Sequence, residues 1–154
     1  MKYVFHYNTP IGRLGIAEEN GAVCRILFEG ESFAGCEVRE TAIIKKAAGE
    51  LDEYFKGKRK DFDLPLLIRG TEFQKAAWKA LVAIRYGETR NYKEIAVAIG
   101  SPRGARAVGM ANNRNPLPII IPCHRVIGAD GSLTGYAGGL DMKKALLDLE
   151  KKHA

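Results

Sequence analysis

NPLPIIIPCHRV, residues 115–126, holds three of the six prolines in this 154-residue chain. Proline fixes its own φ angle and disfavours helix for the residue before it, so residues 115–118 are expected to form an extended loop. The apolar run 119–121 is then expected as a short buried strand that Pro122 ends. The pattern therefore predicts that Cys123 lies at the end of a strand.

Cys123 has the surroundings expected of a nucleophile. His124 and Arg125 follow it, and an electropositive setting lowers the pKa of a thiol and raises its thiolate fraction. Neighbours on an extended strand point to opposite faces, so contact between Cys123 and His124 requires a turn or a bridging water. A buried thiol beside a hydrogen-bonded histidine is the alternative interpretation of the pair.

Two short helices precede the motif. The first is expected over 92–99, stopped by Gly100, and Ser101-Pro102 provides an N-cap and first helical residue for a second helix that ends near Asn112. Such a pair with a tight turn predicts a helix-turn-helix. The second helix is rich in Gly and Ala, which favours close approach to a DNA groove but equally suits close packing in a core.

A domain boundary is expected near residue 70. Thr71-Glu72-Phe73-Gln74 is a capping box that begins a helix, which contains Trp78 as a core anchor and ends near Gly87. The predicted domains are therefore residues 1–68 and 69–154.

The first domain is predicted to be a small antiparallel sheet with one helix. Strands are expected over 3–7, 14–18 and 22–28, with Asn20-Gly21 as a hairpin turn, and apolar residues recur with helical period over 41–55. Cys24 is expected in the core and Cys36 in a loop. The chain as a whole is thus assigned to the α+β class.

A last helix is expected over 140–151. Its apolar face is predicted to consist of Met142, Ala145, Leu146 and Leu149, with Glu150 at the edge of that face.

The basic residues are concentrated in the second half of the chain. Residues 1–70 carry 11 Lys or Arg and 11 Asp or Glu, whereas residues 71–154 carry 13 and 7, so the whole net charge of +6 lies there. This asymmetry indicates a face that binds a polyanion such as DNA, although a solubilising surface has the same composition.

The beginning of the chain and its cysteines indicate the compartment. There is no long apolar segment of the secretory or membrane-spanning kind, and three cysteines without a C-x-x-C pair argue against a disulfide framework or a zinc knuckle. A cytoplasmic, reducing and nucleoid-associated location is therefore expected.

The motif at 115–126 resembles the core motif of the O6-alkylguanine-DNA alkyltransferases, also called methylated-DNA–protein-cysteine methyltransferases. GARAVG at 104–109 and GYAGGL at 135–140 resemble this family in the same order and spacing. LDEYFKG at 51–57 and GTEFQ at 70–74 extend the similarity, while the N-terminal strands match less well. The resemblance implies a ribonuclease-H-like N-terminal domain followed by a mainly helical domain with a winged-helix-like helix-turn-helix.

The resemblance also implies a DNA-repair activity. The thiolate of Cys123 would attack the alkyl carbon on guanine O6 in duplex DNA, and possible activity on O4-alkylthymine is left open. The product would be S-alkylcysteine, which is not hydrolysed in cells, so each molecule would act once. No cofactor and no metal are expected, and the expected partner is alkylated double-stranded DNA bound by a monomer.

Several roles near Cys123 follow from the same resemblance. His124 would take the thiol proton through a water, Glu150 would orient that histidine, and Asn115 would brace the turn. The Tyr92 hydroxyl would stabilise the departing guanine near N3. The remaining expected residues form the substrate pocket: Tyr136, Ala137, Gly138, Pro118 and Val126.

DNA contacts are implied as well. The target base must leave the stack before its O6 can react, and Arg106 matches the intercalating finger of the family, on a helix expected in the minor groove. Tyr92, Lys93, Ser101 and Ala129 match DNA-contacting positions.

Two departures from the family are visible. Ala137 stands where some members have Ser, which leaves tolerance of bulky inhibitors open. The cysteine-rich domain of adaptive-response members is missing, so no regulatory role is expected.

Other function classes compete with repair. An alkyltransferase-like protein binds the lesion without repairing it, but such proteins typically have Trp at the position of Cys123. A helix-turn-helix regulator with a structural or redox-sensing cysteine would bind undamaged sequences. A cysteine hydrolase would turn over repeatedly and usually brings its histidine from elsewhere in the chain.

Overall fold

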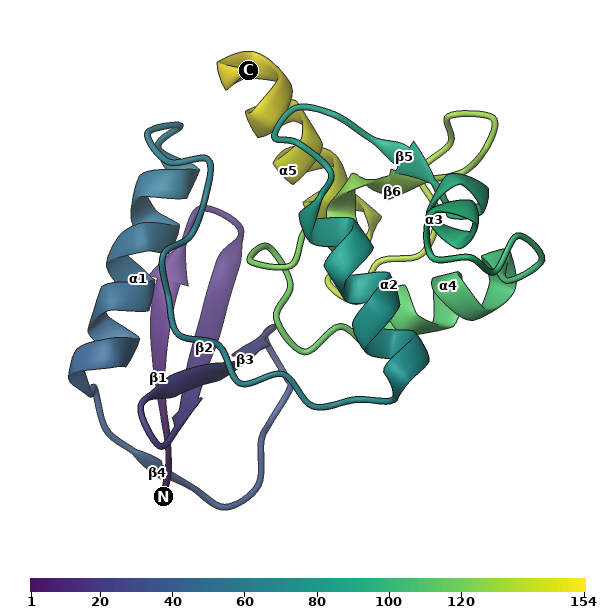
Figure 1. Ribbon diagram of the computed structural model, residues 1–154. Coiled ribbons are helices and arrows are strands. Elements are labelled where there is room, and N and C mark those ends of the chain that lie inside the picture. Colours follow the sequence, from purple (N-terminus) through teal and green to yellow (C-terminus); the bar gives the residue numbers. More distant parts are fainter. The chain divides into compact units, whose positions relative to one another are not determined.

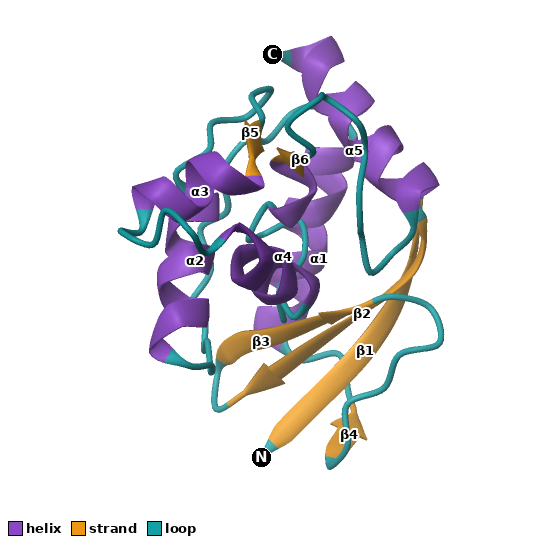
Figure 2. Cartoon of the chain, turned by 90° about the vertical axis from the view of Figure 1, so that its right-hand side faces the viewer, coloured by secondary structure: helices purple, strands orange, loops and turns teal.

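The computed structural model describes residues 1–154 and divides into two compact units, Met1–Ile68 and Arg69–Ala154. The first unit combines a four-stranded sheet with one helix (Figure 1). Figure 2 shows that helices dominate the second unit, whose sheet is a single pair of short strands. The predicted α+β class is confirmed.

The sheet of the first unit has the strand order β3-β2-β1-β4. Its antiparallel meander, as predicted, consists of β1 (Lys2–Thr9), β2 (Gly12–Glu19) and β3 (Ala22–Leu27). Asn20 and Gly21 have φ angles of 52° and 84°, which is the conformation that a two-residue primed hairpin turn requires.

The sheet has a fourth strand that the sequence pattern does not predict. Cys36, expected in a loop, begins β4 (Cys36–Val38), which pairs parallel to β1 and makes the sheet mixed instead of purely antiparallel. Three residues are too few to display an alternating pattern, so only pairing with β1 reveals this strand.

Both faces of the sheet are covered. The helix α1 (Ala42–Phe55) contacts β1, β2 and β3, and Thr41 caps it by accepting a hydrogen bond from the Ile44 amide. A second apolar cluster on the sheet includes Val4, Ala17, Cys24 and Leu27. The burial of Cys24 in this cluster confirms its predicted core position.

The second unit contains α2 (Glu72–Val82), α3 (Tyr92–Ala98), α4 (Ala105–Asn113) and α5 (Leu140–His153), with β5 (Arg90–Asn91) parallel to β6 (Val126–Ile127). The capping box of α2 is present, because the Thr71 and Gln74 side chains each bond the other residue's backbone. Trp78 is buried as predicted, and its indole N–H donates to the Ala111 carbonyl at 2.8 Å. This bond joins α2 to α4.

Two helix boundaries differ from the prediction. α2 ends at Val82 instead of near Gly87, because the Ile84 amide bonds the Leu81 carbonyl in a tight turn. α4 begins at Ala105, so Ser101-Pro102 is not its cap. The Gly104 amide donates to the Ser101 carbonyl at 2.8 Å, which makes residues 101–104 a separate turn between α3 and α4.

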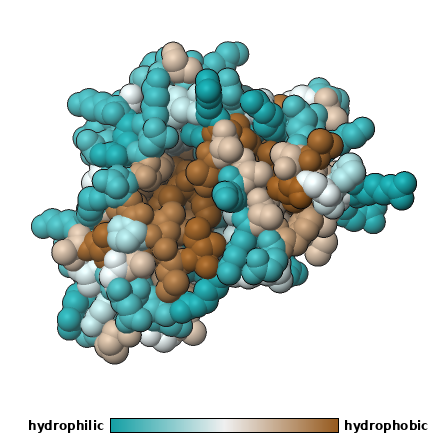
Figure 3. Space-filling model, in the orientation of Figure 1, coloured by the Kyte–Doolittle hydropathy of each residue, from teal (hydrophilic) through white to brown (hydrophobic).

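The face of the molecule seen in Figure 3 is mixed in hydropathy. Figure 3 shows hydrophobic residues gathered in patches between hydrophilic ones on the visible face. None of the helices combines the length and the apolar composition that a membrane span needs.

Candidate active site

The segment that leads to Cys123 is a buried turn and not the predicted strand. Ile119 has a φ of 74°, a left-handed conformation that is rare for a β-branched residue, and the Ile121 amide donates to the Leu117 carbonyl at 2.8 Å. Leu117, Ile119 and Ile121 are all fully buried. Burial of these side chains holds a conformation that the apolar composition alone does not predict.

Asn115 holds both ends of this turn. Its Oδ1 accepts from the Leu117 amide at 2.9 Å, and its Nδ2 donates to the Ile121 carbonyl at 2.7 Å. Pro122, with φ −79° and ψ 67°, then forms an inverse γ-turn that is closed by a bond from the Cys123 amide to the Ile121 carbonyl at 2.7 Å. Cys123 therefore starts a 3₁₀ turn, Cys123–Arg125, instead of ending a strand.

His124 and Glu150 form a buried pair. The histidine Nε2 lies 2.6 Å from the Glu150 carboxylate, and both side chains are almost completely buried. Because Nε2 faces a carboxylate, it carries the ring proton, and Nδ1 is the nitrogen that can accept another one. Burial lowers the pKa of His124 from its ordinary value of 6.5, while Glu150 opposes this effect. The histidine is consequently a neutral base.

Arg125 completes the pair from the other side. Its Nε and Nη2 donate to the two Glu150 oxygens at 2.7 and 3.0 Å, and its Nη1 donates to the Ile84 carbonyl at 2.7 Å. Arg125 thus balances the Glu150 charge and is not a free cation for the thiol. The sequence predicts for Arg125 only a contribution to an electropositive setting around Cys123 and gives no sign of its bonds to Glu150.

The expected low pKa of Cys123 is wrong. Burial raises its pKa to about 11, and this effect outweighs the hydrogen bonds from Asn115 and Tyr136 and the charge of Lys143, which act in the opposite direction. A thiol with this pKa is protonated at neutral pH. Removal of its proton therefore needs a base.

The face that α5 buries also differs from the prediction. Its buried residues are Lys143, Leu146 and Glu150, whereas Ala145 is exposed and Met142 and Leu149 are only partly buried. Glu150 is thus within the buried face and not at its edge. The spacing of three and four residues places these positions on one face of the helix. A search for apolar residues does not find Lys143 and Glu150, because both are charged.

Tyr92 and the segment before Tyr136 are joined. The Tyr92 hydroxyl donates to the Thr134 carbonyl at 3.3 Å and accepts from the Thr134 hydroxyl at 3.1 Å. The Tyr136 hydroxyl faces Cys123, and burial together with the thiolate charge raises the pKa of Tyr136.

The other expected pocket residues differ in exposure. Ala137 is exposed and Gly138 is partly buried, whereas Pro118 and Val126 are buried. Tyr136 is the one whose hydroxyl interacts with the thiol.

The residues expected to contact DNA lie outside the buried cluster. Arg106 on α4, Lys93 on α3 and Ala129 are exposed, and Ser101 is partly exposed in the turn between the two helices. α3 and α4 contact each other, as expected of a helix-turn-helix. Exposed cations on this pair are available for phosphate groups.

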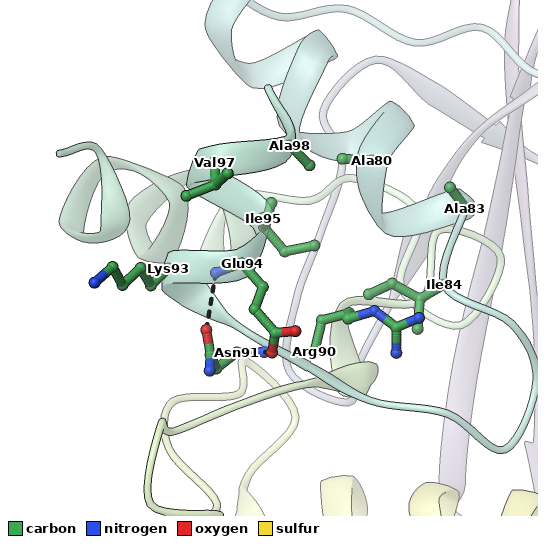
Figure 4. A pocket seen from close by; sticks show the side chains of 10 residues that line it. All are labelled: Ala80, Ala83, Ile84, Arg90, Asn91, Lys93, Glu94, Ile95, Val97 and Ala98. Atoms are coloured by element: carbon green, nitrogen blue, oxygen red, sulfur yellow. Dashed lines mark hydrogen bonds between the residues drawn. The ribbon is translucent and has the colours of Figure 1, made fainter. Parts of the chain in front are cut away.

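A separate cavity of about 510 Å³ lies between α2 and α3 (Figure 4). Its apolar wall includes Ala80, Ile95 and Ala98, and Asn91 and Glu94 lie at one side, joined by the capping bond of α3. Neither Cys123 nor His124 lines it, so this cavity is separate from the cluster around Cys123.

Comparison with known proteins agrees with this geometry. Residues 72–152 match the model of the 6-O-methylguanine DNA methyltransferase DNA-binding domain, and residues 2–68 match that of its ribonuclease-like domain. A methylated-DNA–protein-cysteine methyltransferase of Methanosarcina barkeri is 61% identical over 75% of this chain and 73% of its own. The constitutive one of Bacillus subtilis is 46% identical over 98% and 96%.

A solved structure is also similar along nearly the whole chain. Mycobacterium tuberculosis OGT, crystallised in complex with DNA, has a TM-score of 0.94 and 46% identity, covering 99% of this chain and 94% of its own. The two family models together span almost all of the sequence. The chain therefore belongs to the 6-O-methylguanine DNA methyltransferase family.

Proposed function

We propose that this protein repairs DNA by moving a methyl or larger alkyl group from guanine O6 to the sulfur of Cys123, once per molecule. The observation that carries this proposal is a buried thiol next to a neutral histidine that a carboxylate orients, in the part of the chain that matches the DNA-binding domain of the family. The curated relatives are named for methyl transfer from DNA to a protein cysteine.

The reaction needs no redox partner. His124 Nδ1 takes the proton of the Cys123 thiol through a water, and the sulfur electron pair forms the new bond to the alkyl carbon. The bond between that carbon and O6 breaks, and its electron pair stays on the guanine, which then takes up a proton. The products are a thioether and an unmodified guanine.

The high pKa of Cys123 explains the need for His124. A mostly protonated thiol reacts slowly, so a base whose pKa lies below 6.5 must remove the proton during the reaction. Glu150 keeps the imidazole in the tautomer that leaves Nδ1 as the acceptor. Asn115 fixes the turn that aims the sulfur.

Tyr92 assists the leaving group. Its hydroxyl, which the structure places beside Thr134, would donate to guanine N3 as negative charge develops there. Tyr136, Ala137 and Gly138 form one wall for the flipped base. Val126 and Pro118, which are both buried, complete the proposed pocket.

DNA is bound through α3 and α4. In this proposal α4 enters the minor groove, Arg106 fills the space that the flipped nucleotide leaves, and Lys93, Ser101 and Ala129 contact the backbone. The excess of positive charge in residues 71–154 supports this orientation. The two domains are residues 1–68, ribonuclease-like, and residues 69–154, which carry catalysis and DNA binding.

A reducing compartment that contains DNA fits this function. None of the three cysteines, Cys24, Cys36 and Cys123, is in a disulfide, and oxidation of Cys123 would block the reaction. The proposed location is the cytoplasm, near the nucleoid, and the proposed active form is the monomer.

The proposal is tested by incubating the protein with a duplex oligonucleotide that contains one O6-methylguanine. Mass spectrometry should find one added methyl group per chain, on the peptide that contains Cys123, and the reaction should stop after one equivalent. Cys36→Ser is the matched control and should react normally, while Cys123→Ser should not react. Tight binding of the lesion without methylation of Cys123 would instead identify a recognition protein.

A further inference from the structure

Lys143 is a buried cation beside the reactive cysteine. Its side chain is fully buried on the inner face of α5, about two turns before Glu150 on the same face. Lysine is almost never buried completely unless its charge has a partner, because taking an ammonium group out of water is costly. Such a position calls for a compensating interaction.

The partners of Lys143 are neutral. Its ammonium donates to the Val126 carbonyl at 2.5 Å and to the Thr134 carbonyl at 2.7 Å, and no carboxylate pairs with it. This contrasts with Arg125, whose charge is balanced by Glu150. Two carbonyl dipoles stabilise an ammonium group but do not cancel its charge.

Those two carbonyls belong to segments that shape the site. Val126 follows the Cys123–Arg125 turn directly, and Thr134 lies two residues before Tyr136. The Thr134 carbonyl also accepts the Tyr92 hydroxyl bond. Lys143 therefore connects the backbone after Cys123 to the segment that contains Tyr136 and that the Tyr92 hydroxyl binds.

We propose that Lys143 is a positioning residue that supplies the counter-charge for the Cys123 thiolate and clamps the two segments that flank the thiol. The inference rests on the proposed function, in which Cys123 must become anionic to react. A fixed positive charge in a dry site stabilises a nearby thiolate more strongly than a charge at the surface would.

The other ionisable groups near the thiol cannot replace Lys143. His124 is neutral, the Arg125 charge is balanced by Glu150, and the neutral Tyr136 hydroxyl offers only a hydrogen bond. Burial lowers the pKa of Lys143, while a Cys123 thiolate acts to raise it, and in turn the charge of Lys143 acts to lower the pKa of Cys123. Lys143 is thus the cation near the thiol whose charge no carboxylate balances.

Lys143→Gln tests the charge separately from the hydrogen bonds, because its amide keeps two N–H donors. The measurement is the single-turnover rate of methyl transfer from an O6-methylguanine duplex between pH 6 and 9.5. The pKa of Cys123, about 11, lies above this range, so loss of the charge, which raises that pKa by about one unit, should slow transfer about tenfold at every pH measured. Lys143→Met, which keeps neither the charge nor the hydrogen bonds, should be slower than Lys143→Gln at every pH.

Lys144→Met is the matched control. Lys144 is the next residue of α5, but it is exposed and pairs with Asp148 at 2.8 Å. Its substitution should leave the pH–rate curve in place. A Lys143→Gln protein that transfers the methyl group at the wild-type rate at every pH, or a Lys144→Met protein slowed as much as Lys143→Gln, would overturn the counter-charge role.

A reciprocal measurement does not require a Lys143 variant to fold. In protein labelled with ¹³C at the lysine ε-carbons, Lys143 should titrate at a lower pH in Cys123→Ser than in the wild type, because the thiolate that stabilises the ammonium is missing. Identical titrations would refute the coupling. If the wild type accepts no methyl group, the proposed function fails, whereas this titration still decides whether the two charges interact.

Discussion

The buried Arg125–Glu150 pair should be much more strongly coupled than a surface pair of the same geometry. In Arg125→Met the two bonds of 2.7 and 3.0 Å to the carboxylate disappear, and so does the bond of 2.7 Å to the Ile84 carbonyl. Glu150, which is 1% exposed, is then left as an uncompensated buried charge. Breaking such a pair costs about 3–5 kcal/mol of unfolding free energy.

Removing both charges should restore much of that loss. Arg125→Met combined with Glu150→Gln leaves no unpaired buried charge. The loss of unfolding free energy in the double variant should therefore be smaller, by at least about 2 kcal/mol, than the sum of the losses in the two single variants. Urea unfolding followed by fluorescence of Trp78, the single tryptophan, measures each variant. The slope of free energy against urea should stay constant across the set.

The exposed Lys144–Asp148 pair is the control cycle. Its nitrogen–oxygen distance is 2.8 Å, close to that of the buried pair, but its side chains are 67% and 62% exposed. Lys144→Met and Asp148→Asn should therefore be coupled by no more than about 0.5 kcal/mol. Additive losses in the Arg125–Glu150 cycle, or equal coupling in both cycles, would refute the argument that burial makes this pair strong.

Three further outcomes are expected. Arg106→Ala should slow repair of duplex DNA at least about tenfold but leave the reaction with free O6-benzylguanine unchanged, because only the duplex requires base flipping. Substitution of the exposed Arg103 by Ala is the control. Equal losses of rate on both substrates would contradict the proposed role of Arg106 as the intercalating finger. The folded-state pKa of His124 is lowered, so its contribution to stability should be complete above pH 6.5 and decline as the pH falls below that value; His124→Gln should flatten this part of a stability–pH curve measured by thermal unfolding. Leu146→Ala should cost about 2–5 kcal/mol in urea unfolding because Leu146 is fully buried, whereas Leu140→Ala, at a 48% exposed position, should change little.

Local signals predicted the elements that depend on short-range chemistry. The Asn20-Gly21 turn needs two residues that tolerate positive φ, and the capping box at Thr71 needs a hydroxyl and an amide three residues apart. Both are present as predicted. The helix at 42–55 is predictable from the sequence because its apolar residues recur with helical period.

The strand β4 and the turn at 117–123 could not be found in this way. β4 exists because three residues pair with β1 from a distant part of the chain. The run at 119–121 has the composition of a strand, but Asn115 binds the backbone at both ends and forces Ile119 to a φ of 74°. In both cases the deciding bonds come from outside the segment.

The sequence by itself pointed to Cys123 as the proposed nucleophile, since the residues around it and their spacing are local and specific. Only the tertiary structure decided its electrostatics. Burial raises the pKa of Cys123, while Arg125, two residues further along the chain, is balanced by Glu150, and Lys143 of α5 binds the Val126 carbonyl and acts on the thiol through its charge. Charge in a protein interior depends on the partners that folding brings together, and those partners lie about 20 or more residues apart in this chain.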